Sequence, residues 1–110
     1  MKLPNGEQAI VDIAKLRDYC LNPAHARGRH KARVFAATLG LSAADAGFLR
    51  DELLRAARDG DATLGEVDQF RDRYAIDIEL ARRERRGVVR SAWIIRRGES
   101  TPRLTSCYVL

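Results

Sequence analysis

Long apolar runs are absent from this chain of 110 residues, and no signal-peptide pattern is present near its start. The sequence therefore predicts a cytoplasmic protein with no membrane partner. Cysteine is also scarce, because Cys20 and Cys107 are too few for a disulfide framework, and we expect both thiols to be reduced. Internal repeats, linkers and low-complexity tracts are missing. The length then suits one domain spanning residues 1–110, with a single hydrophobic core.

Lysine and aromatic residues are few as well. Only three of the twenty basic residues are lysines, and the rest are arginines, whose planar guanidinium suits bidentate contacts to phosphate. Three Phe, three Tyr and one Trp offer little surface for stacking single-stranded bases. The net charge of +5, carried mainly by arginine, favours nucleic acid over a membrane surface as the partner.

The charge is divided into blocks along the chain. Residues 24–40 hold four basic side chains and no acid, and residues 81–110 hold eight basic side chains and two acids. Between them, residues 41–80 hold ten acids and five basic side chains. The two basic blocks are expected to supply the contacts to RNA, through Arg27, Arg29, Lys31, Arg33, Arg96 and Arg97.

Residues 9–22 carry apolar side chains at helical spacing and predict a first helix. Asp12 or Asn5 could cap its N-terminus, and Pro23 would end it. On this helix Cys20 would be buried.

Two further helices are expected. One runs from about Arg29 to Leu39 and is closed by Gly40, a residue that adopts the left-handed conformation of helix C-caps without strain. The other has a capping-box-like start at Ser42 and Asp45 and ends at Gly60.

After residue 61 the apolar period changes from helical to alternating. Strands are predicted over Tyr74–Leu80, Val88–Ile95 and Leu104–Leu110, separated by a charged turn at residues 82–87 and a second turn at residues 98–102. Short connections favour antiparallel pairing. The predicted fold class is α+β, with about three N-terminal helices followed by an antiparallel sheet of three or more strands.

The most unusual segment is residues 25–33, which joins His25 and His30 to four cations without an acid. Positive side chains at a helix start oppose the macrodipole, whose positive end already lies there. A phosphate would resolve that conflict, because amides and cations would converge on one anion. The simpler interpretation is a solvated charged face. His30 points away from the apolar stripe of its helix, so it is not expected in the core.

Alternation along the strands places side chains on two faces. Tyr74, Ile76, Ile78 and Leu80 are expected toward the helices, as are Val89, Ser91, Trp93 and Ile95. The last strand is ambiguous: if Cys107 and Val109 are buried, Ser106 and Tyr108 join Arg90 on the open face. Such a face, beside the two histidines, would hold the groups that metal-free phosphodiester cleavage requires. Alternatively, Arg90 is only a cross-strand partner for Asp77 or Glu79.

Three stretches carry a family resemblance, namely LNPAHARGRHKARVF at residues 21–35, RSAWIIR at residues 90–96 and PRLTSCYV at residues 102–109. They resemble an uncharacterised bacterial domain family that occurs alone and at the C-termini of polymorphic toxins. That family is in turn similar to the barnase, EndoU, colicin and RelE group of ribonucleases. The resemblance implies a metal-independent endoribonuclease toxin that cleaves tRNA or mRNA by attack of the 2′-hydroxyl, without a cofactor, and that an acidic antitoxin or immunity protein could neutralise.

The resemblance also implies catalytic positions. His25 and His30 match the histidine of the helical part, Arg90 matches the strand arginine, and the last strand contributes Thr105, Ser106 and Tyr108. The chain departs from the EndoU pattern, since it lacks the paired histidines followed by Lys, Thr and Tyr.

Two other functions remain open from the sequence. One is a non-catalytic RNA-binding or partner-binding module that uses the same arginines. The other is a zinc site formed by Cys20, His25, His30 and Cys107, whose spacing fits no known zinc pattern.

Overall fold

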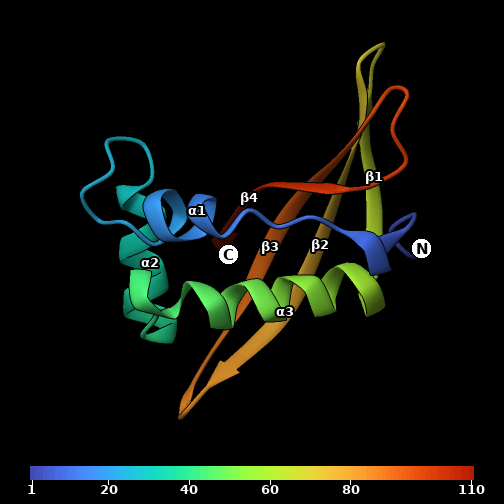
Figure 1. The fold of residues 1–110 in the computed structure, drawn as a ribbon. Helices are drawn as coiled ribbons and strands as arrows, with labels where there is room; N and C mark the ends of the chain where they lie inside the picture. The colour runs from blue at the N-terminus through green and yellow to red at the C-terminus, as the bar shows by residue number, and fades with distance from the viewer.

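A computed structural model describes all residues from 1 to 110 and has the expected α+β class (Figure 1). The sheet is antiparallel with strand order β1-β2-β3-β4, and the helical segments precede it in the chain. The elements are η1 (Gly6–Gln8), α1 (Ile13–Lys15), η2 (Leu16–Cys20), α2 (Arg29–Leu39), η3 (Ala43–Asp45), α3 (Ala46–Asp59), β1 (Ala62–Val67), β2 (Arg71–Arg82), β3 (Arg85–Arg96) and β4 (Arg103–Val109).

The first helical segment is shorter than the predicted 9–22. Its cap is Asp12, whose side chain accepts a hydrogen bond from the backbone N–H of Ala14 at 3.0 Å. Ile10 before it is extended and pairs with the sheet, because its N–H donates to Pro102 O at 2.9 Å and its carbonyl accepts from Leu104 N at 3.0 Å. The prediction was wrong for residues 9–12, where this pairing beside β4 replaces helical hydrogen bonds.

The other two helices follow their local signals. Helix α2 spans the predicted residues and ends at Gly40, which has φ 66° and donates its N–H to Ala36 O at 3.0 Å. A capping box joins Ser42 and Asp45 at the start of η3, and α3 continues to Asp59, directly before Gly60. Both helices therefore owe their ends to side chains and conformations that the sequence makes visible.

The sheet is larger than the alternating pattern indicated. Strands β2 and β3 pair as far as Arg82 and Arg85, so the predicted turn at residues 82–87 is mostly strand and the connection is only Arg83–Glu84. Strand β1 was not predicted, because its burial pattern, one buried residue followed by five exposed ones, gives no alternation. It lies at the edge of the sheet, paired only with β2.

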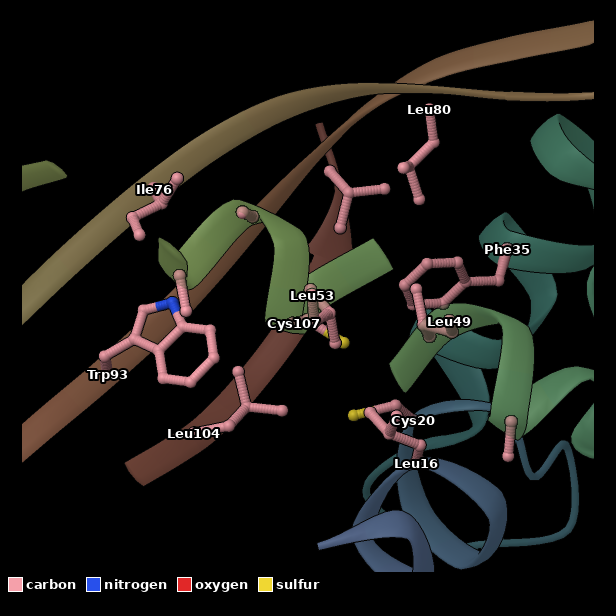
Figure 2. Packing of buried hydrophobic residues seen from close by; sticks show 14 of the residues in the cluster. Leu16, Cys20, Phe35, Leu49, Leu53, Ile76, Leu80, Trp93, Leu104 and Cys107 are labelled. Carbon is pink, nitrogen blue, oxygen red and sulfur yellow. The ribbon is translucent and has the colours of Figure 1, made fainter. Parts of the chain in front are cut away.

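The core lies between the helices and one face of the sheet (Figure 2). Trp93 is fully buried and its Nε1–H donates to Ser91 Oγ at 2.9 Å, while Ser91 Oγ donates to Ile76 O at 3.0 Å. Most predicted faces are correct, with Ile78 and Ile95 only half-buried. Ile94 is an exception, since it is buried on the face expected to be open.

A bulge in β4 settles the ambiguous last strand. Tyr108 pairs with Arg90 and Ser106 with Ala92, but the register shifts so that Leu104, not Thr105, pairs with Trp93. Leu104 and Cys107 are consequently both buried in the core, three residues apart.

None of the helices by itself combines the length and apolar content that a bilayer crossing requires. The bent pair formed by α2 and the segment Ala43–Asp59, which meet at 76°, passes that test only when counted together.

Candidate functional site

Arg90 lies in a row of polar side chains on the open face of the sheet, the face turned away from the core. Cross-strand pairing places Asp77 on one side of it and Tyr108 on the other. Its guanidinium donates Nε–H and Nη2–H to the two carboxylate oxygens of Asp77, each at 2.8 Å. The hydrogen bonds to Asp77, and secondly the neighbouring Tyr108 phenol, raise the pKa of Arg90, so this side chain stays charged. The expected cross-strand partner of Arg90 is therefore present, beside a phenol.

Tyr108 links this row to the basic helix. It lines a hollow of about 300 Å³ together with Val109 of β4 and with His30, Lys31 and Val34 of α2. His30 is exposed, as its position opposite the apolar stripe predicted. On the other side of Arg90, a second hollow of about 420 Å³ is lined by Asp61, Thr63, Ala75, Asp77 and Arg90. The fold thus gathers His30, Tyr108 and Arg90, which are distant in sequence, along one continuous surface.

His25 holds the turn that begins α2. Its Nδ1 accepts hydrogen bonds from the backbone N–H groups of Arg27 and Gly28, both at 3.0 Å, so Nδ1 carries no proton and Nε2 carries the proton of the neutral ring. The ring also contacts Tyr19 edge-on, with centroids 4.7 Å apart. Unlike His30, His25 does not line the hollow beside Tyr108. The contacts of His25 with Arg27, Gly28 and Tyr19 therefore position the start of α2.

Lys31 is half-buried and turned toward Tyr19. Its Nζ donates to Tyr19 Oη at 3.1 Å and lies 4.9 Å from the centre of that ring. The lysine also lines the hollow beside Tyr108. Tyr19 was not singled out from the sequence, because no periodic or charged pattern marks it; only the folded contacts with His25 and Lys31 connect it to the site.

The expected RNA-binding arginines fall into two groups. Arg29 and Arg33 are exposed on the N-terminal half of α2, Arg27 is exposed in the turn before it, and none of the three forms an ion pair. Arg96 and Arg97 instead face acids, with Arg97 Nη2 2.7 Å from Asp72 Oδ1 and Arg96 Nη1 3.7 Å from Glu99 Oε1.

The second group is also distant from the first. Arg96 lies six residues beyond Arg90 on β3, about 20 Å away along the strand. The structure therefore does not bring Arg96 and Arg97 beside the hollow that His30 and Tyr108 line.

The other last-strand candidates are more shielded. Thr105 Oγ1 donates to Ala92 O at 3.1 Å across the bulge. Ser106 Oγ is buried without a hydrogen-bond partner. Of the three last-strand candidates, Tyr108 is therefore the one that lines the hollow beside His30.

The four residues of the zinc alternative do not form a cluster. Cys20 and Cys107 meet in the core (Figure 2), but nowhere do three or more His, Cys, Asp or Glu side chains converge as metal ligands. Hydrogen bonding to Cys20, together with burial, raises the pKa of Cys107 well above its usual value. The pair is explained by core packing, and both thiols are free.

Comparison with known proteins gives a family and no activity. No curated protein and no solved structure matches the chain. One family model covers nearly all of it, from residue 2 to residue 110, and is described as a domain of unknown function. The chain therefore belongs to the DUF6883 family.

Proposed function

We propose that this protein is a metal-independent endoribonuclease toxin that acts on tRNA or mRNA in the cytoplasm. Its active site would be the surface where the N-terminal half of α2 meets the end of β4. The observation that carries the proposal is the common hollow of His30 and Tyr108, together with the position of Arg90 beside the Tyr108 phenol. An acid–base group, a hydroxyl and a permanent cation are the minimum set for cleaving a phosphodiester through a 2′,3′-cyclic phosphate.

Each residue has a role in this mechanism. His30, exposed to solvent, would take the proton of the 2′-hydroxyl or supply one to the leaving 5′-oxygen. Tyr108 would hydrogen-bond a phosphoryl oxygen or act as the second proton-transfer group. Arg90 would stabilise the charge that develops on the phosphorane, with Asp77 holding its guanidinium in place.

The basic segment would bind the substrate next to the reacting phosphate. Arg27, Arg29 and Arg33 have no acidic partners, so their charges are available to RNA phosphates. A protein that neutralises the toxin would have to cover the same surface. We propose an acidic antitoxin or immunity protein for that role, because charge complementarity would accelerate its association.

The first experiment is a cleavage assay with the purified protein and pools of tRNA, rRNA and mRNA in the presence of EDTA. We expect cleavage that survives chelation, with 2′,3′-cyclic phosphate on the new 3′ ends, and growth arrest when the chain is expressed inducibly. Intact RNA in every pool would reject the enzymatic proposal, and cleavage abolished by EDTA would reject its metal independence.

A non-catalytic RNA-binding module is the second candidate. It is favoured by one observation: Asp77 engages the Nε and Nη2 donors of Arg90, whereas Arg29 and Arg33 of α2 form no ion pair. If this second function is correct, the protein binds RNA but does not cleave it. The double variant Arg29→Ala with Arg33→Ala should then lose two phosphate contacts. For a single strand, this loss should reduce the magnitude of the negative slope of log K against log salt by about 1.4. Arg96→Ala with Arg97→Ala, whose charges face acids, is the matched control.

A further inference from the structure

The hairpin between β2 and β3 contains an unusual turn. Arg82 pairs with Arg85, leaving Arg83 and Glu84 as a two-residue connection. Arg83 has φ 56°, and of the two central residues only Arg83 has a positive φ. This matches a type II′ turn, which normally has glycine at its first central position. A side chain larger than glycine's is strained there, and strained backbone of this kind gathers at functional sites.

A hollow lies beside that turn. It measures about 560 Å³ and is lined by Leu39 and Gly40 at the end of α2 and by the hairpin residues Arg82, Arg83, Glu84 and Arg85. Three guanidinium groups thus surround it against one acid, Glu84. Neither Arg83 nor Glu84 has a partner in an ion pair. The lining therefore has a positive excess that a bound anion would balance.

Two of the arginines are fixed in position by contacts to the helices. Arg85 Nη1 donates to the carbonyls of Ala36 and Ala37, at 3.3 and 2.8 Å. Arg82 Nη2 lies 2.8 Å from Asp45 Oδ1, and its guanidinium stacks on Phe48 at 4.6 Å from the ring centre. Arg82 Nη1 is buried and has no hydrogen-bond acceptor. These contacts to the helices hold both guanidinium groups in place beside the hollow.

The hollow lies at the opposite end of α2 from His30, because Leu39 and Gly40 at the C-terminal end of the helix line it. Eleven residues at 1.5 Å each make that helix about 16 Å long. Arg29 and Arg33 share one exposed helical face, being four residues apart, and Ala37, whose carbonyl Arg85 holds, is the next residue on it. Cations therefore continue from the proposed site to the hairpin along one side of the molecule.

We propose that this hairpin hollow binds a backbone phosphate of single-stranded RNA, several nucleotides from the bond that is cut at His30. The inference rests on the proposed function for the position of the cut, but binding can be measured without cleavage. Arginine forks suit a phosphate, and the row of cations along α2 suits a second phosphate on the same strand. The protein should accordingly select long single strands over dinucleotides.

The test compares binding of a 2′-O-methyl decanucleotide and a 2′-O-methyl dinucleotide, which 2′-hydroxyl attack cannot cleave, by fluorescence anisotropy. Arg83→Gly should weaken decanucleotide binding several-fold and reduce the magnitude of the negative slope of log K against log salt by about 0.7. The affinity for the dinucleotide should not change. Glycine also relieves the positive φ, so this variant should raise the Tm by a few degrees. Glu84→Gln should tighten decanucleotide binding. Arg58→Ala, an exposed arginine on α3 paired only with its neighbour Asp59, is the matched control.

Each outcome decides the inference. If Arg83→Gly raises the Tm and binds the decanucleotide as well as wild type does, the hairpin phosphate site is wrong. If poly-glutamate binds in an Arg83-dependent way and the decanucleotide does not, the hollow accepts an acidic protein segment and the RNA assignment is overturned. If Arg83→Gly weakens decanucleotide binding while wild type cleaves no RNA, the hairpin site stands and the endoribonuclease proposal fails.

Discussion

Arg90 shows how one residue can satisfy two interpretations of a sequence. Its bidentate contact with Asp77 is the structural role expected for a cross-strand pair, and its neighbour Tyr108 is the group expected for chemistry. Both side chains of the ion pair are about two-fifths exposed, at 42% and 40%. The pair is therefore screened by water, and its main effect is to orient the guanidinium rather than to stabilise the fold.

The pH dependence of the stability of Asp77→Asn tests how much the Arg90–Asp77 ion pair stabilises the fold. Arg90 lowers the pKa of Asp77, so the stabilisation is complete above the ordinary aspartate pKa and is lost as the pH falls through the lower pKa of the folded state. At neutral pH the free energy of unfolding of the variant should be about 0.2–1 kcal/mol lower than that of wild type, and the difference should vanish in acid once Asp77 is protonated in the folded protein. Urea titrations at both pH values measure this. A difference that grows in acid would contradict the assignment.

Ser91 and Ser106 form a matched pair of buried hydroxyls with opposite expectations. Ser91 Oγ accepts from Trp93 Nε1 in the core, so Ser91→Ala should cost about 1–3 kcal/mol by leaving the indole N–H unpaired. Ser106 Oγ has no partner, so Ser106→Ala should change stability little or increase it. Thermal unfolding of both variants measures the contrast, and equal losses would contradict the network around Trp93.

At the scale of elements, α2 depends on a close contact at its start. A Cβ added to Gly28 would lie 2.1 Å from the carbonyl oxygen of Tyr19, so no other residue fits without moving the turn that His25 caps. That turn positions the N-terminal half of α2, where His30 and the free arginines lie.

Gly28→Ala should therefore destabilise the domain and displace His30, whereas Gly47→Ala should not. Gly47 lies inside α3 with no atom within 4 Å of an added Cβ, so alanine there should stabilise the helix by about 0.5–1 kcal/mol. Melting curves and the His30 imidazole NMR signals compare the two. A Gly28→Ala protein that melts with wild type and keeps its His30 signals would refute the contact.

Elements with local signals were predictable from the sequence, and elements set by distant pairing were not. Gly40 and the Ser42–Asp45 box mark the ends of helices within a few residues of chain. Ile10 pairs with Arg103, more than ninety residues away, and no local pattern reports that bridge. Strand β1 is missed for the same reason, because an exposed edge strand needs only one partner and shows no alternating burial.

The candidate site was predictable in its residues and less so in their grouping. Period-two alternation left the last strand ambiguous and put Tyr108 beside Arg90 only in one of two arrangements, because the bulge that shifts Thr105 and shields Ser106 depends on how β4 meets β3. The sequence also gave no means to separate the two histidines. Only the fold directs His25 Nδ1 to its own turn and brings His30 to the Tyr108 hollow.

For the whole molecule, the distribution of charge matters more than the net value of +5. Arginines that face acids, such as Arg97 and Arg103, support the sheet, whereas those of α2 are exposed without partners. Lys31 lines the hollow that His30 and Tyr108 share, and Arg29 and Arg33 lie on the same helix, whose C-terminal end reaches the hairpin hollow. The account therefore places substrate binding on one side of the molecule.

The most direct test is the rate of RNA cleavage by purified His30→Ala, Arg90→Ala and Tyr108→Phe proteins. The account predicts that His30→Ala and Arg90→Ala each reduce cleavage by about a hundredfold or more, the usual loss for one acid–base or electrostatic group, while circular dichroism shows all three folded. Tyr108→Phe removes a single hydroxyl and should reduce the rate without altering stability. Three folded variants that cleave as fast as wild type would contradict the site where α2 meets β4.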